Sequence, residues 1–416
     1  MSNSCGFKCM ERRFDSTVNM HHIYVDEYQR PILLPCLFAR YTELQGVRVE
    51  IKSYKNRDTN QKEDVIKLAE IGTDASYKIC NHLGRFLEWV DAYDRNCYVK
   101  LSIHTALPQE IINEYINDYL IEECRGSEHV ARQAVNALSA YYNWLMYFFD
   151  NKYKSIYIKP KYREAARNNN RAEKAVKYLL PQTRQLFYQN SDSLLEELVL
   201  RCGGELGLRT KENQGLLLND YTANTQKHKG MLTLFDELER HPEKEEFKYH
   251  LSSLYTKYSR SRTLYIPRYL LEKMKLYYDT ERPLSDSNHL FVSSSSNHSY
   301  GHCISKRFAT DTFAKVRNKL MIEIGKHPER FTNYQEIQNF TVYHHLRHSF
   351  GTDLFYNLCR NENKRYESIV TSSSIYLTTA VRLGHKVEGR RANNVTKEYI
   401  HSCGLREQLL MESVNG

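Results

Sequence analysis

Apolar side chains recur at helical spacing through the stretch from residue 72 to residue 150. Amphipathic stripes with apolar residues at i, i+3 or i+4, and i+7 occupy residues 79–90, 111–120 and 130–148. Pro108 precedes the second stripe, where a helix can begin, and Gly126-Ser127 separates the second stripe from the third. The pattern therefore predicts a small helical bundle.

Shorter patterns on either side of this bundle predict strands and further helices. Alternation at residues 47–51 and the β-branched and aromatic run at 23–25 predict short strands. In the second half of the chain, helical stripes occupy 194–200 and 308–320, and a β-hairpin is predicted within 247–267. Together these elements predict a mainly α protein with a small β component, an α+β fold.

The composition is that of a soluble globular protein of two or three domains. Of the 416 residues, 41% are hydrophobic, and no apolar run approaches the roughly 20 residues that span a bilayer. The first residues, 1–14, lack the apolar core of a signal peptide, so we do not expect export. Ten cysteines without a paired framework are typical of reduced thiols. We therefore expect a cytoplasmic protein that does not contact a membrane.

The charge balance favours a polyanionic partner. The formal net charge is +9, and residues 151–177 hold nine Lys or Arg against two Glu, with tyrosines among them. One interpretation of this stretch is a solvated linker. The other is a hinge that follows a phosphate backbone, where each neutralised phosphate would add about 0.9 to the salt slope of binding. The two interpretations are compatible with each other.

The strongest candidate for chemistry is the stretch 341–355, T-V-Y-H-H-L-R-H-S-F-G-T-D-L-F. On a helix, His344, Arg347 and His348 stand at i, i+3 and i+4 and share one face. The arginine fork matches phosphate oxygens and stays charged at any working pH. The alternative is an ordinary basic face in solvent. The first interpretation predicts a phosphate substrate.

Two patterns suggest metal binding, and neither fits well. His344 and His348 have the spacing of H-E-x-x-H, but His345 stands at the glutamate position and a fixed positive charge lies beside them. Near the N-terminus, the pair at residues 5 and 9, C-x3-C, is followed by the adjacent histidines 21 and 22, which do not have the usual H-x3–5-H spacing. We therefore predict no metal and no cofactor.

Several motifs in order give a family resemblance. Residues 344–352, H-H-L-R-H-S-F-G-T, resemble the second motif box of the tyrosine site-specific recombinases, the phage integrase family. Residues 207–212, G-L-R-T-K-E, resemble the first box, and residues 383–385, L-G-H, resemble a later element of the family. Tyr399 takes the place of the family's nucleophile, and no other tyrosine lies beyond residue 385. The resemblance covers roughly residues 72–405.

The resemblance implies a set of site residues. These are Arg209, Lys257, His344, Arg347, His385 and Tyr399 as catalytic residues, with Glu212 and His348 in support. By this resemblance Tyr399 attacks a DNA phosphodiester and forms a 3′-phosphotyrosyl bond. Arg209 and Arg347 hold the non-bridging oxygens, with His385 as a further donor. No metal takes part in such a reaction.

Proton transfer would fall to two further residues. His344 would help to manage the proton of the tyrosine, whose free pKa is near 10. The leaving 5′-oxygen needs a proton, and the family's catalytic lysine lies on a β-hairpin. Here residues 247–255 and 262–267 read as strands around a turn at 256–261, which selects Lys257, with Lys248 and Arg260 as alternatives.

The resemblance also implies a domain order and a function. We predict an N-terminal extension (1–70) that contacts DNA or packs, a helical core-binding domain (71–155), a basic linker (156–177) and a mixed α/β catalytic domain (178–416). The predicted function is a site-specific DNA recombinase, the integrase of a mobile element. Alternatives are a topoisomerase of the type IB kind, a non-catalytic DNA-binding protein with the same fold, and a metal-dependent hydrolase.

The predicted partners follow from that function. They are double-stranded DNA with a specific recombination site, further copies of the chain in a homotetramer on DNA, and accessory DNA-bending or directionality factors. The predicted location is the cytoplasm, in association with the nucleoid.

Overall fold

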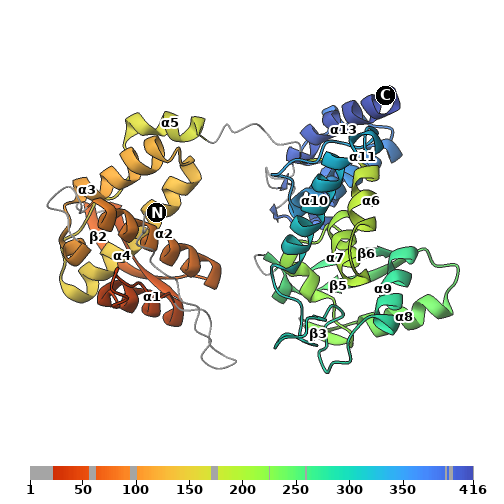
Figure 1. Ribbon diagram of the computed structural model, residues 1–416, viewed down its shortest axis with the longest axis horizontal. Coiled ribbons are helices and arrows are strands. Elements are labelled where there is room, and N and C mark those ends of the chain that lie inside the picture. Colours follow the sequence, from red (N-terminus) through yellow and green to blue (C-terminus); the bar gives the residue numbers. More distant parts are fainter. Residues whose placement is uncertain are drawn as a thin grey trace. The chain divides into compact units, whose positions relative to one another are not determined.

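The computed structural model describes residues 22–55, 62–93, 101–169, 177–223, 225–257, 260–388, 391–392 and 397–415. The chain divides into two compact units, residues 1–173 and 174–416. Among the described residues the structure is mainly helical, with four two-stranded antiparallel sheets (Figure 1). The predicted α+β fold class is therefore confirmed.

The N-terminal unit is a helical bundle with one long β-hairpin. Its elements are α1 (Leu33–Gln45), β1 (Val47–Lys55), β2 (Lys62–Glu70), α2 (Thr73–Tyr93), η1 (Leu101–Ala106), α3 (Gln109–Glu114), η2 (Tyr115–Glu123), α4 (Glu128–Phe149), η3 (Pro160–Tyr162) and α5 (Arg163–Asn168). The three predicted stripes lie on α2, on α3 with η2, and on α4. The Ser127 side chain accepts a hydrogen bond from the backbone N–H of Val130 and caps α4, at the predicted interruption.

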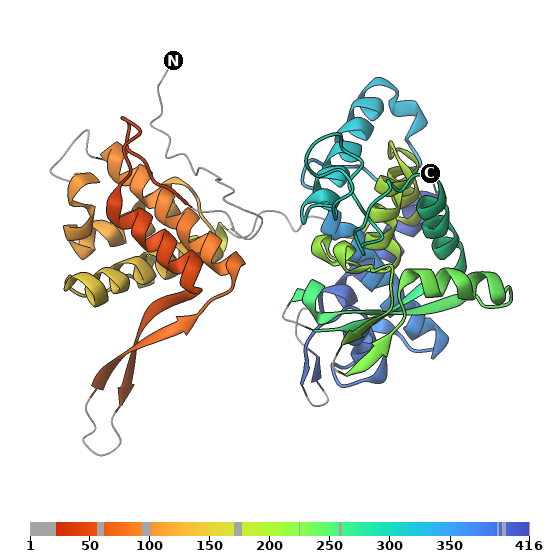
Figure 2. The ribbon, with the colours of Figure 1, turned by 90° about the horizontal axis from the view of Figure 1, so that it is seen from below.

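The segment before residue 71 packs on this bundle. Phe38 of α1 and Val49 of β1 lie in the same buried core as Phe86, Leu138 and Tyr141 of the helices. Figure 2 shows the β1–β2 hairpin extending away from the helices. The strand predicted at 47–51 is thus confirmed as part of β1, whose partner is β2.

The strand predicted at 23–25 is wrong. Only an isolated bridge joins Val25 to Pro31, because a turn closes directly after it. In that turn Asp26 accepts hydrogen bonds from the backbone N–H groups of Tyr28 and Arg30. A side chain that satisfies backbone donors in this way competes with the ladder of a strand.

The C-terminal unit holds the predicted motifs. Its elements are α6 (Pro181–Gln189), α7 (Leu194–Glu205), η4 (Thr210–Gly215), β3 (Tyr221–Ala223), β4 (Gln226–His228), α8 (Met231–Arg240), β5 (Glu246–Leu251), η5 (Ser253–Tyr255), β6 (Arg262–Pro267), α9 (Arg268–Thr280), α10 (Phe308–Lys326), η7 (Pro328–Arg330), α11 (Tyr343–Asn361), η8 (Tyr366–Ser368), α12 (Ser374–Arg382), β7 (Val387–Glu388), β8 (Arg391–Ala392) and α13 (Lys397–Asn415). The helices predicted at 194–200 and 308–320 lie within α7 and α10. The helix predicted at 341–355 begins two residues later, as α11.

Helix α11 is the organising element of this unit. It packs against α7, α12 and α13, and Tyr343 and Leu346 at its start belong to the large core of the unit (Figure 1). Further along, Phe355 and Cys359 pack in a second cluster with Cys403 of α13. The helix therefore joins the large core of the unit to the last helix of the chain.

The hairpin predicted within 247–267 is present, with a shorter first strand. Strand β5 pairs with β6 in antiparallel register, Glu246 opposite Pro267 and Leu251 opposite Arg262. The first strand ends at Leu251 rather than at 255, because the Ser252 side chain accepts from the N–H of Leu254 and starts a 3-10 turn.

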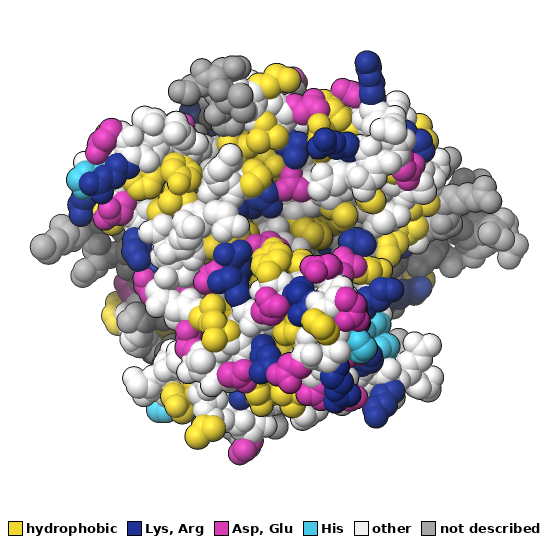
Figure 3. Space-filling view, turned by 90° about the vertical axis from the view of Figure 1, so that its right-hand side faces the viewer, with side chains coloured by type: hydrophobic (Ala, Val, Ile, Leu, Met, Phe, Trp, Pro, Cys, Tyr) yellow, Lys and Arg dark blue, Asp and Glu magenta, His cyan; other side chains and the backbone are white. Residues whose placement is uncertain are grey.

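The face of the molecule drawn in Figure 3 carries basic, acidic and apolar side chains side by side. Positive charge on that face is therefore mixed with negative charge rather than gathered into one patch. Among the described residues, none of the helices combines the length and apolar character that crossing a membrane requires. The predicted boundaries at 70, 155 and 177 stay predictions; the division of the structure, at 173, falls inside the predicted linker.

Candidate active site

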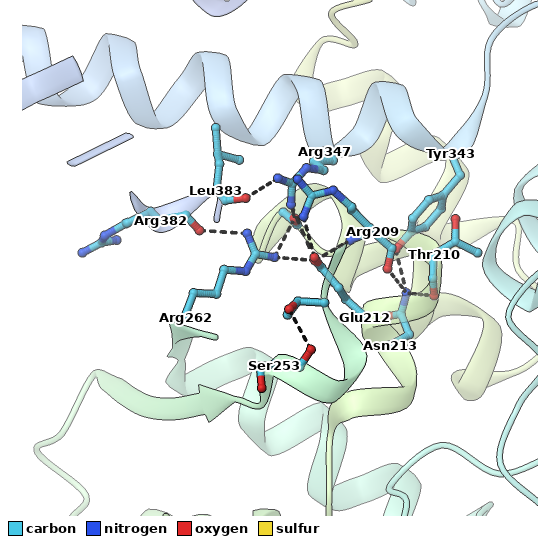
Figure 4. Close-up of polar contacts among 12 residues, drawn as sticks. Arg209, Thr210, Glu212, Asn213, Ser253, Arg262, Tyr343, Arg347, Arg382 and Leu383 are labelled. Carbon is cyan, nitrogen blue, oxygen red and sulfur yellow. Dashed lines mark hydrogen bonds and ion pairs between the residues drawn. The ribbon is translucent and has the colours of Figure 1, made fainter. Parts of the chain in front are cut away.

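One buried carboxylate gathers three arginines from three parts of the sequence (Figure 4). Glu212 is 1% exposed. Its Oε1 lies 2.6 Å from Nη1 of Arg209, and its Oε2 lies 2.7 Å from Nη2 of Arg262 and 3.6 Å from Nη1 of Arg347. Burial acts to raise the pKa of Glu212, but the guanidiniums of these arginines lower it below its usual value. The carboxylate therefore stays ionised and holds the three cations together.

The local backbone of the first motif box positions Arg209 and Glu212 in this centre. Gly207 has a φ of +64° and follows α7, and a Cβ there would lie 2.5 Å from a ring carbon of Phe350, so a side chain is excluded. Arg209 is the N-cap residue of η4, and the Glu212 carboxylate accepts a hydrogen bond of 2.9 Å from the Arg209 backbone N–H. This capping arrangement directs Arg209 and Glu212 toward one another.

Arg347 is buried beneath this centre rather than open to solvent. Its side chain is 1% exposed, and it donates hydrogen bonds to the backbone carbonyls of Gly207 and Leu383. The second box is thereby tied both to the first box and to the L-G-H turn. The Arg209 side chain is 24% exposed, so it is the more accessible of these two predicted arginines.

Arg262 was not predicted as a site residue. It is the first residue of β6, its side chain is 1% exposed, and it donates to the Glu212 carboxylate. It also donates to the carbonyl of Gly207 at 3.0 Å and to that of Arg382 at 2.9 Å. Alternation on β6 gives a signal that was available, because Arg262 shares its inward face with Leu264 and Ile266. A buried arginine on such a face requires a partner.

The predicted histidines lie around the same cations. His344 is exposed and His348 buried, with ring centroids 6.2 Å apart on α11. His385 is half-buried after Gly384, whose φ is +64° and whose Cβ position lies 3.2 Å from Cδ of Arg262. The predicted site residues Arg209, His344, Arg347 and His385 are therefore close enough to influence one another.

The imidazoles of His344 and His385 are both neutral at physiological pH. Partial desolvation, with the nearby guanidiniums of Arg347 and Arg209, lowers the pKa of His344 to about 4. Burial and the same arginines lower the pKa of His385 to about 3. Solvent still reaches His344, and its ring is crowded by cations at the same time. A neutral imidazole can accept a proton, which a protonated one cannot.

All three candidates for the lysine role lie on the β5–β6 hairpin. Lys257 is exposed, in the turn five residues before Arg262. Lys248 lies in the middle of β5, with its Nζ 5.9 Å from the ring centroid of Tyr265 across the hairpin. Arg260 is half-buried beside the start of β6. The choice of Lys257 stays a prediction.

The backbone of Tyr399 lies in α13, but its side chain lies outside the described residues. The later part of α13 is fixed to α11. Asp353 of α11 accepts from Nε of Arg406 at 2.9 Å, from Tyr178 at 2.7 Å and from Arg184 at 2.5 Å. The helix that carries the predicted nucleophile is therefore anchored on the helix that carries His344 and Arg347.

Of the earlier metal patterns, His344 and His348 are placed by the structure among guanidiniums, where a cation would be repelled. Cys5, Cys9 and His21 lie outside the described residues, whereas His22 is described.

Comparison with solved structures finds integrases at low sequence identity. The Tn1549 transposon integrase (residues 82–397) in complex with circular intermediate DNA is similar over 88% of this chain and 94% of its own, at 12% identity and a TM-score of 0.47. A lambda integrase (75–356) dimer bound to a COC′ core site is similar over 80% and 90%, at 12% identity and 0.43. The integrase from mycobacterium phage Brujita is similar over 82% and 87%, at 14% identity and 0.29.

No protein-family model and no curated protein matches the chain. At this level of similarity, function is inferred from the side chains of the chain itself.

Proposed function

We propose that this protein is a site-specific DNA recombinase that integrates or excises a mobile element through a 3′-phosphotyrosyl intermediate. One observation carries the proposal: Arg209, Arg262 and Arg347 surround the single carboxylate of Glu212 and leave a surplus of two positive charges. A phosphodiester carries one negative charge and gains a second when an oxygen nucleophile adds to phosphorus. The surplus therefore matches the transition state better than the ground state.

The reaction forms one bond to phosphorus as it breaks another. The phenolic oxygen of Tyr399 attacks the phosphorus in line, the bond from phosphorus to the 5′-oxygen breaks, and the 3′ end stays attached to the tyrosine. Arg209, which is partly exposed, is suited to contact a non-bridging oxygen, and Arg347 is suited to hold the site rigid from beneath. Rejoining reverses these steps with a 5′-hydroxyl as the nucleophile, so no energy-rich cofactor is consumed.

Protons move through neighbouring side chains. His344 is neutral because its pKa is lowered to about 4, and it is the proposed acceptor of the phenol proton. Since the low pKa makes it a weak base, the proton moves as the oxygen attacks phosphorus rather than before the attack. His385 is neutral as well and can donate an N–H to a phosphate oxygen without adding charge. Lys257, on the exposed hairpin turn, is the proposed donor to the leaving 5′-oxygen. His348 packs beside His344 and supports its position.

The proposed partners are a duplex with a specific site, other copies of the chain in a homotetramer, and accessory DNA-bending or directionality factors. The proposed location is the cytoplasm, with the nucleoid. The two-domain order, with a helical core-binding unit before the catalytic unit, is part of the same proposal.

The test uses labelled DNA from the junctions of the element that carries the gene. The native chain should give a protein–DNA complex that survives denaturing electrophoresis, in EDTA as well as without it. Tyr399→Phe should abolish that complex and leave mobility-shift binding unchanged. Tyr300→Phe, at a tyrosine that is 55% exposed, is the matched control and should behave as the native chain.

Three outcomes would contradict the proposal. A covalent complex that persists in Tyr399→Phe would remove that residue from the role. Relaxation of supercoiled plasmid without any site pair would favour the topoisomerase. DNA binding without a covalent complex, from the native chain as well as from Tyr399→Phe, would favour a non-catalytic DNA-binding protein.

A further inference from the structure

A second polar cluster lies in the N-terminal unit, apart from the site described above. His22 precedes α1, Glu43 lies on α1 and Cys80 lies on α2. One ligand atom from each, an imidazole nitrogen, a carboxylate oxygen and a thiol sulfur, lies within 4.8 Å of the other two. Nitrogen, oxygen and sulfur donors of this kind are the ligands that zinc takes in proteins.

The cluster is shielded from solvent. The side chains of His22 and Glu43 are 2% and 7% exposed, and Cys80 is fully buried. Nδ1 of His22 lies 2.5 Å from Oε1 of Glu43, so the two side chains are hydrogen-bonded in the absence of an ion. A hydrogen-bonded pair of this kind explains His22 and Glu43 by itself. Cys80 packs in the apolar core of the unit, and its sulfur is the third potential ligand atom.

Charge and geometry favour an ion in place of the hydrogen bond between His22 and Glu43. A thiolate, a carboxylate and a neutral imidazole carry two negative charges, which a divalent cation cancels, and a buried site requires such a balance. Zinc bonds of about 2.0 to 2.3 Å place tetrahedral ligands roughly 3.3 to 3.8 Å apart. The observed spread of 4.8 Å therefore requires side-chain movements of about 1 Å, while the His22–Glu43 pair opens slightly.

A cavity supplies room for a fourth ligand. It has a volume of about 200 Å³, and His22, Cys80 and Asn81 line it. Arg85 and Glu88 line it as well, and their opposite charges add no net charge to the wall. The Asn81 Oδ1 atom lies 3.4 Å from Nε2 of His22. This amide oxygen accepts a hydrogen bond from the far ring nitrogen and orients the imidazole, so a water molecule in the cavity is the fourth ligand of a tetrahedral set.

We propose that His22, Glu43 and Cys80 bind one Zn²⁺ ion, which ties the segment before α1 to α1 and α2. The ion has a structural role within the N-terminal unit and takes no part in the proposed DNA reaction. The cluster lies in a different unit from the Glu212 centre, so this proposal stands or falls separately from the proposed function.

The first measurement is metal content and Co²⁺ binding by the full-length chain. Elemental analysis should find about one zinc per chain, and the chain stripped with a chelator should take up one Co²⁺ with the near-ultraviolet band of a cobalt–thiolate bond. Absence of that band, or no stoichiometric uptake, would overturn the assignment.

Variants identify the ligands. Cys80→Ser should lose the thiolate band, and Glu43→Gln should keep it but weaken Zn²⁺ binding at least about tenfold. Cys124→Ser, at an exposed cysteine of the same unit, and His82→Gln, at a buried histidine of α2, are the controls and should bind as the native chain does. A band that persists in Cys80→Ser would contradict the proposal.

A separate variant tests the cysteines at residues 5 and 9. The double variant Cys5→Ser with Cys9→Ser should retain one Co²⁺ and the thiolate band, since Cys80 supplies the sulfur. Loss of the metal in this variant would assign binding to the C-x3-C pattern at residues 5 and 9 and overturn the proposed ligand set.

Discussion

Among the described residues, each unit holds a glutamate with a largely buried side chain and polar neighbours, Glu212 in one and Glu43 in the other, and the two surroundings have opposite charge. Around Glu212 lie three guanidiniums and two neutral imidazoles, which leave positive charge in excess. Around Glu43 lie an imidazole and a thiol, which gain negative charge when the thiol ionises. A buried carboxylate therefore does not by itself indicate a ligand. The sign of the remaining charge does: an anion suits the first centre and a cation suits the second.

The two centres can be observed separately because both tryptophans, Trp89 and Trp144, lie in the N-terminal unit. Tryptophan fluorescence therefore reports the unfolding of that unit, whereas far-ultraviolet circular dichroism reports both units. A perturbation confined to one centre should shift one signal and not the other.

Removal of the Glu212 charge should have the largest effect. Glu212→Gln leaves three buried or half-buried arginines without their counter-charge, so the C-terminal unit should lose about 3 to 5 kcal/mol in its free energy of unfolding. Urea titration should show the dichroism transition moving to lower urea, with the tryptophan transition unchanged. Glu239→Gln, at a glutamate whose side chain is 65% exposed, should change neither signal. An equal shift of both signals would contradict the separation of the two centres.

Loss of one cation should reduce cleavage more than binding. Arg347→Ala should lower the rate of covalent complex formation about 10² to 10³-fold, equivalent to roughly 2.7 to 4 kcal/mol of transition-state stabilisation. Arg347→Lys should recover little, because one ammonium cannot reach the carbonyls of Gly207 and Leu383 together. Single-turnover rates on labelled DNA give the comparison. Arg360→Ala, at an exposed residue of the same helix, should retain the native rate.

Acid should act on the C-terminal centre at an unusually low pH. The pKa values of His344 and His385 are lowered to about 4 and about 3, so the single-turnover cleavage rate should show no inflection near the ordinary histidine pKa of about 6.5 and should fall only below about pH 5. Below about pH 6.5 the unfolded chain binds more protons than the folded one at these histidines, so stability should decline from there down to about pH 3. A rate inflection near 6.5 would show that these imidazoles are not shielded.

Removal of metal should have the smallest effect, a lower thermal stability of the N-terminal unit. EDTA should lower the thermal midpoint seen by tryptophan fluorescence, by about 2 to 4 °C for each kcal/mol of binding energy lost. The cleavage rate at 25 °C should be unchanged. In Cys80→Ser, EDTA should no longer shift that midpoint, whereas in Cys124→Ser it should shift it as in the native chain.

Short-range patterns predicted much of the fold. The stripes on α2 and α4, the hairpin at 247–267 and the helix that carries His344 and Arg347 all depend on the spacing of nearby residues, which the sequence displays directly. The run at 23–25 has the composition of a strand, but its neighbouring turn removes the partner that a strand requires.

The candidate site was predicted only in part, for a related reason. Arg209 and Glu212 belong to one short motif and Arg347 to another, and the residues of each motif are close together in the sequence. Alternation on β6 places Arg262 on the inward face, but no local spacing identifies Glu212 as its partner. The third ligand at Cys80 was missed likewise, since 58 positions separate it from His22 and their proximity depends on how α2 packs. Tyr399 and Lys257 remain predictions in their roles.

The carbonyl oxygen of Gly207 accepts from both Arg262 and Arg347. The two guanidiniums therefore share one anchoring atom, and a shift of either alters the position of the other. In a double-mutant cycle, the losses of transition-state stabilisation from the two single substitutions should sum to more than the loss from the double substitution. Adding up single-residue effects would thus overstate how much each arginine contributes on its own.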